Sequence, residues 1–476
     1  MPKMARSDHI YFLRQAFVTF TVCVQSVGIG IMLGFPAILN PAIVDPDSDI
    51  KASSSDASWL ASILGMAGVI GFFVLSPLLQ TAGRKWTNIL KNLIMGIGWI
   101  IFYYATSLPA LYAARFIQGV SMGGIYINVI LIGEYSDPDR RGYYTAFQKA
   151  SLSAGTLFCH AMALSFTWRD VAAIAIIPPM LASILTCFWP ESPFFLAMRG
   201  RFDECEKSFH WLNGTKRNQE LKDLISSQRT RIEQEKYDQR TIRKWLHLLS
   251  RRDFRRALLI VAILTVAIDL SGRNFLKAYI VQIMTSLTGS KTTGVYFSIL
   301  SDSLVIIALL LSSLVIKFCP RRRLLFTFGP LTVLTLIVIS LVLFLKNTYD
   351  FNISLWVGPC LILFVNIVVH MGVSPVGFVI FGEIFPLDLK GFGSFFSGIV
   401  FTASYGTILK LTPVLMESLG VEGAYFIYGC SLAVCLVLLF FILPETKDKT
   451  LSEIESRLKG EPKSVCEKEN TLLGVS

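Results

Sequence analysis

Three charged side chains interrupt an otherwise apolar stretch, and they are the residues best suited to recognise a polar solute. Asp269, Arg273 and Lys277 follow one another at intervals of four residues, so a helix would place all three on one face. An ionisable side chain inside an apolar helix is costly unless it is paired or hydrated, and it usually marks a solute pathway. Two interpretations remain open. The set is a cavity wall that contacts a modified or charged solute, or it neutralises itself near a helix end and reaches water, with Asp302 as a further partner.

A second set of charges recurs in the two halves of the sequence. GEYSDPDRRG at 133–142 is matched by GEIFPLDLKG at 382–391, and Pro190-Glu191 is matched by Pro444-Glu445. The final glycines of the first pair are 249 residues apart and the two prolines are 254 residues apart. These nearly equal offsets indicate a duplicated unit, with the polar interval 190–256 as the linker between the two copies.

The composition places the two copies in a membrane. Of the 476 residues, 53% are hydrophobic and 16% are charged, and the mean hydropathy is +0.57. Soluble domains contain about 25% charged residues. Apolar segments of about twenty residues, which are long enough to cross a bilayer as helices, recur along the chain. We predict an all-α polytopic membrane protein.

Six apolar segments precede the linker and six follow it. We therefore expect twelve transmembrane helices in two six-helix, pseudo-symmetric halves. The expected regions are an N-terminal tail at 1–15, a first half at 16–189, the helical linker at 190–256, a second half at 257–443 and a C-terminal tail at 444–476. The expected spans are 16–39, 59–79, 88–106, 111–133, 143–166, 171–189, 257–287, 294–318, 324–345, 354–381, 391–415 and 424–443.

The distribution of charge predicts the topology. The net charge is +11, and the basic residues concentrate in the tails, in the linker and in every second loop. This is the positive-inside pattern, so we expect a cell-membrane protein with both termini in the cytoplasm, and we exclude nucleic acid as a partner. The nine cysteines show neither a metal-ligand spacing nor a pair in an outside loop, so we expect no metal and no disulfide framework.

Several local motifs resemble the sugar porter branch of the major facilitator superfamily. They are ARFIQG at 114–119, PESPFFLAMRGR at 190–201, DLSGRN at 269–274 and PETKDKTLSEIE at 444–455, together with the two Gly-Glu segments. The linker is similar to that of insect facilitated trehalose transporters. The resemblance implies the major facilitator fold, in which the two halves rock about a substrate site between them.

The resemblance also assigns roles to charges at the cytoplasmic ends of the spans. Opposite charges there bridge the halves and hold an inner gate shut, at about 1–3 kcal/mol for each partly buried pair. Interfacial anchoring alone is the alternative. Pro320 and Lys317 depart from the family pattern, so we expect one pairing residue of the second half to be missing. The expected gate residues are Arg84, Glu134, Arg141, Glu191, Arg321, Arg322, Glu383, Lys390 and Glu445.

The family binds sugars through neutral amides and aromatic side chains, and most of those amides are absent here. Lys149 occupies a glutamine position, Ile268 and Asp269 replace paired glutamines, and Phe378 replaces a tryptophan. Val305 stands at an expected asparagine, and Phe401 begins what is usually an Asn-Trp pair. We expect the substrate wall to contain Gln148, Lys149, Asp269, Arg273, Asn274, Lys277, Tyr279, Phe378 and Phe401.

Two further expectations concern a hinge and a modification. Gly372, Pro375 and Gly377 interrupt one span and could form its gating hinge, although close packing is the alternative. Asn352 begins an Asn-Ile-Ser triplet in an outside loop, which is a glycosylation signal lying close to the membrane.

The prediction for function is a carrier of a hexose or a trehalose-like disaccharide that works by facilitated diffusion through alternating access. The sequence has neither a phosphate-binding loop nor a nucleophile–base set in a soluble domain, so we expect no enzyme activity, no cofactor and no obligate protein partner. Proton-coupled relatives carry an Asp in the first span, whereas 16–39 has no acid. The alternatives are a carrier of a different or charged organic solute and a non-transporting solute sensor.

Overall fold

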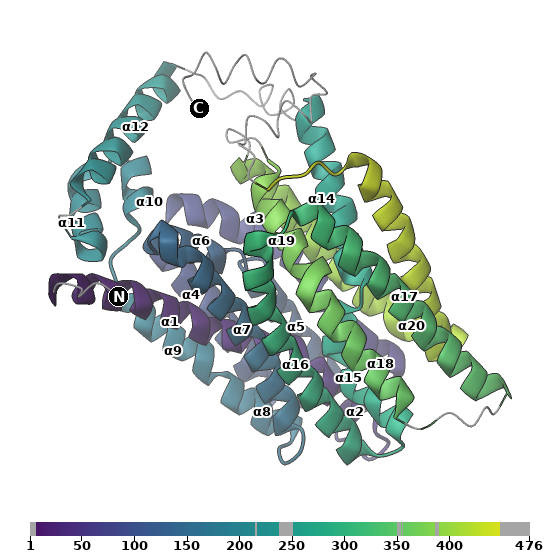
Figure 1. Cartoon of the computed structure of the whole chain (residues 1–476). Helices are drawn as coiled ribbons and strands as arrows, with labels where there is room; N and C mark the ends of the chain where they lie inside the picture. Colours follow the sequence, from purple (N-terminus) through teal and green to yellow (C-terminus); the bar gives the residue numbers. More distant parts are fainter. Residues whose placement is uncertain are drawn as a thin grey trace. The chain divides into compact units, whose positions relative to one another are not determined.

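The computed structural model describes residues 6–214, 217–237, 251–349, 354, 356–385 and 390–447. These residues form helices and connecting turns, and none of them is in a β-strand. The chain divides into two compact units, Met1–Arg240 and Thr241–Ser476. Figure 1 labels the helices in both units.

The first unit contains the six expected spans and the linker helices. Three of these spans are each formed by two consecutive helices, because Gly, Pro or an irregular turn interrupts the backbone hydrogen bonds between them. The helices of the spans are α1 (Arg6–Gly34), α2 (Pro36–Val44), α3 (Ser54–Thr81), α4 (Arg84–Tyr104), α5 (Leu108–Met122), α6 (Ile127–Tyr135), α7 (Pro138–Met162), α8 (Trp168–Ala175) and α9 (Ile177–Cys187). The linker helices are α10 (Pro193–Met198), α11 (Phe202–Asn213) and α12 (Asn218–Tyr237).

The second unit contains the other six spans. They are formed by α14 (Arg252–Leu270), α15 (Arg273–Thr288), α16 (Lys291–Phe318), α17 (Arg321–Tyr349), α18 (Val357–Val368), a π-helical turn η1 (Val369–Val373), α19 (Ser374–Glu383) and α20 (Lys390–Ile442). The long α20 comprises two spans that meet at Gly420, whose φ of 74° is not helical.

Eight described segments are long and apolar enough to cross a membrane, and the last of them, Phe395–Ile442, contains two expected spans. The three expected spans outside this set are α4, α7 and the α14–α15 pair. These three carry buried or half-buried polar residues, among them Lys91, Gln148 and Asp269. Two of these three less apolar spans, α7 and the α14–α15 pair, carry the polar and charged residues of the expected substrate wall.

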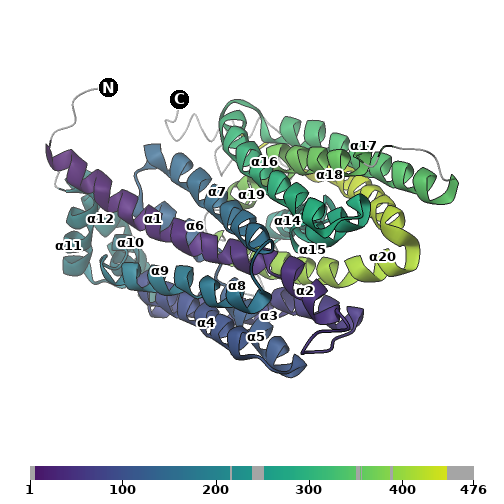
Figure 2. The ribbon, with the colours of Figure 1, turned by 90° about the horizontal axis from the view of Figure 1, so that it is seen from below.

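Glycines allow the closest helix contacts in the first unit. Figure 1 and Figure 2 both show α7 beside α1, and these two helices pack along much of their length. A Cβ atom on Gly155 of α7 would lie 2.1 Å from the carbonyl oxygen of Val27, and one on Gly30 of α1 would lie 2.0 Å from that of Leu152. The two backbones therefore touch at reciprocal glycines, as small residues permit in membrane helices.

Gly155→Ala is expected to destabilise the first unit strongly, because the new methyl group meets backbone rather than a movable side chain. Overpacking of this kind costs about 1–3 kcal/mol or more. Gly133→Ala is the matched control, since a Cβ there has no neighbour within 4 Å. We expect thermal unfolding in detergent to show a clear loss for the first variant and none for the second. Equal unfolding temperatures would contradict the close contact.

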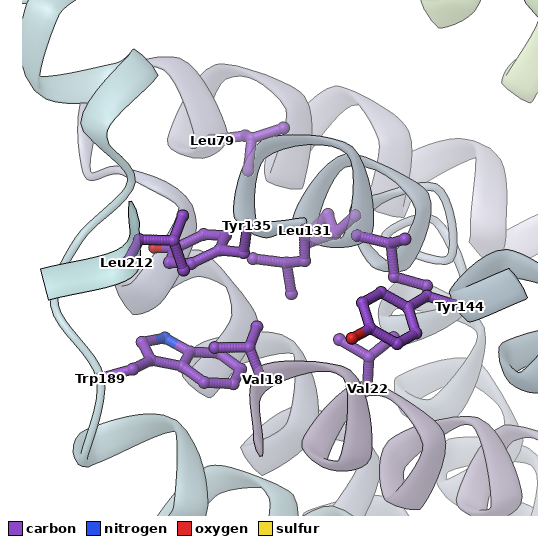
Figure 3. Close-up of a cluster of buried hydrophobic side chains, with 10 residues drawn as sticks. Val18, Val22, Leu79, Leu131, Tyr135, Tyr144, Trp189 and Leu212 are labelled. Atoms are coloured by element: carbon purple, nitrogen blue, oxygen red, sulfur yellow. The ribbon is translucent and has the colours of Figure 1, made fainter. Parts of the chain in front are cut away.

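Buried aromatic and aliphatic side chains tie the linker to the ends of the spans. Figure 3 shows one cluster that contains Val18 of α1, Tyr135 of α6 and Leu212 of α11, together with Trp189, which follows α9. The rings of Tyr135 and Trp189 lie 5.7 Å apart, and Trp189 is 1% exposed. The polar linker is thus anchored by an apolar contact to the same helix ends that carry the gate residues.

Candidate functional site

A first cluster of charged residues, at the ends of the spans, joins α4, α6 and the segment after α9. The Arg84 guanidinium, 4% exposed, donates from Nε and Nη2 to the Glu134 carboxylate at 2.9 Å. Glu191 accepts from the backbone N–H groups of Arg84 at 2.9 Å and of Lys85 at 3.1 Å, so it caps the start of α4. Ser192 donates its hydroxyl to Glu134. Every carboxylate in the cluster is paired or hydrogen-bonded.

The backbone turn before α4 is shaped to receive Glu191. Gly83 has a φ of 99°, and a Cβ there would lie 2.3 Å from Oε2 of Glu191. Burial raises the pKa of the Glu191 carboxyl above its usual value, while the N–H groups of Ser192, Lys85 and Arg84 oppose the rise. The bare backbone of Gly83 leaves the room that this carboxylate occupies.

The second unit repeats this cluster. Arg321 pairs with Glu383 at 3.1 Å, and Glu445 accepts from the backbone N–H groups of Arg321 and Arg322, each at 3.0 Å. Thr446 donates to Glu383 at 2.6 Å, as Ser192 does to Glu134. The expectation that one pairing residue is missing here is wrong, because Arg321 reaches Glu383 despite the altered turn before it.

Both charged clusters join helices of their own unit. Bridging between the halves therefore stays a prediction. Arg141 is exposed near the start of α7, and in the part of the chain described its side chain makes no contact with the first cluster. Lys390 begins α20, but its side chain lies outside the described residues, as does Asn352.

The span that carries Asp269, Arg273 and Lys277 is broken. It ends as α14 at Leu270, and α15 begins at Arg273 after Gly272, whose φ is 98°. The expectation of one continuous helix at 257–287 is wrong, because this left-handed glycine ends the helical ladder. Broken helices of this kind commonly form the solute sites of membrane transporters.

The break gives each charged side chain its own environment. Asp269 is fully buried, and its two oxygens accept from Asn274 Nδ2 and Ser404 Oγ, each at 2.5 Å. Among the described residues no direct ion pair joins Asp269 to Arg273, but their opposite charges act on each other, so the self-neutralising alternative stays open. Buried Lys277 interacts electrostatically with buried Asp302.

Aromatic side chains complete this part of the second unit. The Arg273 guanidinium carbon lies 4.9 Å from the centre of the Phe378 ring, and that ring meets Phe401 edge-on at 5.8 Å. Tyr279 is buried and donates to the carbonyl oxygen of Leu409 at 3.1 Å, which ties α15 to α20. The structure therefore brings together Asp269, Arg273, Asn274, Phe378 and Phe401. Tyr279 instead links α15 to α20 through its hydrogen bond.

The candidate hinge coincides with the π-helical turn. Gly372 lies within η1, and Pro375 lies in the first turn of α19. π-helical turns are rare and often occur at functional sites. A Cβ on Gly372 would lie 2.2 Å from Cβ of Phe328, and one on Gly377 would lie 2.4 Å from Cδ1 of Ile268. Both glycines are thus also needed for close packing, and the hinge remains a prediction.

The first unit contains a buried polar cluster that sequence reasoning missed, apart from Gln148. Asn128 Oδ1 accepts from Gln25 Nε2 and from Lys91 Nζ, each at 2.7 Å, and Asn92 donates to Gln25 at 2.9 Å. Gln148 donates to Ser26 at 3.1 Å, whereas Lys149 is half-buried. These side chains come from four spans, so no local sequence pattern predicts that they form one cluster. Isolated polar residues within apolar segments were the one available signal.

Comparison with known proteins identifies the family. The family described as "Sugar (and other) transporter" matches residues 18–458. The chain belongs to this sugar transporter family. Its relatives include two proteins named facilitated trehalose transporter Tret1. The one from Polypedilum vanderplanki is 26% identical over 95% of this chain and 90% of the relative. The one from Bombyx mori is 25% identical over 96% of this chain and 89% of the relative. The chain spans 49% of the Drosophila grimshawi Tret1, to which it is 25% identical over 95% of its own length.

Solved structures of sugar transporters share the fold. The proton:xylose symporter XylE bound to 6-bromo-6-deoxy-D-glucose has a TM-score of 0.74 and 18% identity, covering 95% of this chain and 99% of that one. The inward-open conformation of XylE from E. coli has a TM-score of 0.74 and 16% identity. The match covers 94% of this chain and 99% of that one. The prediction of a polytopic, all-helical major facilitator fold is therefore confirmed.

Proposed function

We propose that this chain moves a hexose or a trehalose-like disaccharide across the cell membrane by facilitated diffusion. Membership of the sugar transporter family over residues 18–458 is the observation that carries the proposal. The relatives named as facilitated trehalose transporters support the substrate class. Transport requires the solute to be bound and released unchanged, so no catalytic group is assigned.

The two charged clusters support alternating access as the mechanism. Each one fastens three helix ends through a buried or half-buried Arg–Glu pair, so that the unit moves as one body. Two rigid bodies with two preferred arrangements can expose a site to one side at a time, and a solute that binds both arrangements is carried through. We place both termini in the cytoplasm, on the side of the basic loops.

The proposed substrate wall combines neutral and charged groups. Gln148 contributes from the first half, and Asn274, Phe378 and Phe401 contribute from the second. Asp269 positions Asn274 and Ser404 by accepting a hydrogen bond from each. Arg273 supplies the charged donor, since its guanidinium is held against the Phe378 ring.

We infer transport without a coupling ion. The buried polar residues of α1 are Gln15, Thr19, Thr21, Gln25 and Ser26, and none of them is an acid. A span without a carboxylate has no group there to take up and release a proton at neutral pH.

The decisive experiment is uptake of radiolabelled trehalose, glucose and fructose into proteoliposomes that hold the purified full chain. We expect saturable entry of at least one sugar with no ion gradient, and no loss on adding a protonophore at constant sugar gradient. Liposomes that hold heat-unfolded protein serve as the inactive control. Entry that collapses with the protonophore would refute uncoupled transport, and the absence of entry by folded protein would refute sugar transport.

A further inference from the structure

We propose that the break between α14 and α15 forms a binding site for a carboxylate, and that the substrate is an acidic sugar such as a uronate. The inference rests on the proposed sugar transport and narrows its substrate class. Three observations support it: a guanidinium that forms no direct ion pair among the described residues, a helix start beside it, and a buried histidine with an unused ring nitrogen.

Arg273 is placed to bind an anion. It is the first residue of α15, a helix of 16 residues that no side chain caps. The start of a helix carries partial positive charge and attracts anions. The guanidinium carbon lies 4.9 Å from the centre of the Phe378 ring, and this cation–π contact holds the group beside the helix start.

The hydrogen bonds of Arg273 are poorly satisfied within the described residues. Its Nη1 has one long contact of 3.4 Å to the amide oxygen of Asn274, and its Nε is buried without a hydrogen bond. A buried donor without an acceptor costs free energy, so an incoming acceptor is favoured. A carboxylate can accept two parallel hydrogen bonds from a guanidinium.

His370 provides a second, independent indication of a ligand. It is 2% exposed, its Nδ1 lies 2.9 Å from the carbonyl oxygen of Asn366, and its Nε2 has no hydrogen bond within the described part of the chain. The ring lies near enough to Lys277 and Arg273 for their charges to act on it. Because a carbonyl oxygen can only accept, Nδ1 donates, and Nε2 of the neutral ring is an acceptor suited to a sugar hydroxyl.

The donors of Arg273 and the charges around it favour a carboxylate over a more highly charged anion. Both oxygens of Asp269 are engaged by Asn274 and Ser404, and the charge of Lys277 is opposed by Asp302. The charges of Asp269 and Arg273 also act on each other, so the site has no large excess of positive charge, and what remains for the ligand is the poorly satisfied donor edge of Arg273. A carboxylate carries one negative charge, whereas a phosphate monoester carries about 1.5 to 2 at neutral pH. The site therefore fits an acidic sugar better than a sugar phosphate.

Equilibrium binding of glucuronate, glucose and glucose 6-phosphate to the purified full chain tests this inference. Glucuronate differs from glucose only by a carboxylate in place of the terminal hydroxymethyl group, so the two form a matched pair. We expect glucuronate to bind at least about tenfold more tightly than glucose, since a hydrogen bond to a charged group is worth about 1.5–3 kcal/mol.

Variants assign the preference to residues. Arg273→Gln is expected to bring the two affinities to within about twofold, and Arg273→Lys to retain part of the preference, because the charge remains without the planar fork. Lys291→Gln removes an exposed cation from the same unit and should keep the full preference. His370→Phe is expected to lower the affinities for glucuronate and glucose by a similar factor of about five, which corresponds to the loss of one neutral hydrogen bond. Thermal unfolding of each variant verifies that it is folded.

The outcomes separate the two proposals. Equal affinities for glucose and glucuronate in the unaltered chain would overturn the carboxylate site and leave sugar transport standing. Tighter binding of glucose 6-phosphate would overturn the choice of a carboxylate, and a preference that survives Arg273→Gln would overturn the role of Arg273. Failure of folded protein to bind any of the three, or trehalose, would overturn both proposals.

Discussion

Glu134→Ala is expected to lower the free energy of unfolding by about 3–5 kcal/mol, because it leaves the buried Arg84 guanidinium without its counter-charge. Arg84 and Glu134 are 4% and 14% exposed. The duplicated chain offers an internal comparison, since Arg321 and Glu383 make the same pair at 17% and 30% exposure. Glu383→Ala should therefore cost less, about 1–3 kcal/mol.

Thermal and denaturant unfolding of the two variants in detergent measures this difference. The control is Glu204→Ala, which removes an ion pair with Arg201 in which both side chains are about half exposed, at 53% and 52%. Surface pairs of this kind contribute about 0–1 kcal/mol. A larger loss for Glu383→Ala than for Glu134→Ala would show that burial does not set the strength of these pairs.

Asn128→Leu is the second substitution for which we expect a large loss, again about 3–5 kcal/mol. The amide oxygen of Asn128 accepts from both Lys91 and Gln25, and all three side chains are at most 1% exposed. Removing that oxygen leaves a buried ammonium and a buried amide without an acceptor. Lys91→Met alone should change stability by less than about 1.5 kcal/mol, because Gln25 still satisfies Asn128 and the volume is similar.

The double variant Lys91→Met, Asn128→Leu makes this prediction specific. Once the ammonium is gone, only the Gln25 amide lacks its acceptor, and a neutral group of this kind costs about 1–3 kcal/mol. The double variant should therefore be more stable than Asn128→Leu. Unfolding temperatures of the four proteins form a double-mutant cycle. Additive losses would mean that Lys91 and Asn128 do not depend on each other.

The fold could be predicted from the sequence because its signals are local and repeated. Apolar segments of about twenty residues and the matched Gly-Glu and Pro-Glu motifs predicted the spans and the duplication. The positions of Arg84, Glu134, Arg321 and Glu383 at the ends of those spans were predicted, but their pairing within each unit was not. The break at Gly272 was not predicted, since one glycine in an apolar segment is compatible with an unbroken membrane helix.

The polar cluster around Lys91 could not be predicted for a different reason. Gln25, Lys91 and Asn128 lie on three spans separated by tens of residues, and only tertiary packing brings them together. Asp269 and Arg273 suggested a direct pair by their spacing. In the structure the oxygens of Asp269 accept hydrogen bonds from Asn274 and Ser404 instead. Ser404 lies 135 residues away in the sequence, so local spacing could not predict this partner.

The π-helical turn at Val369–Val373 acts as a one-residue insertion in a helix that is otherwise regular. An α-helix advances about 100° per residue, so one additional residue rotates everything that follows by that angle. His370 lies in the turn, and Phe378 lies two turns of helix beyond it. The aromatic face that holds the Arg273 guanidinium therefore owes its direction to this extra residue: in an uninterrupted α-helix, the Phe378 ring would point about 100° away from where it now meets Arg273.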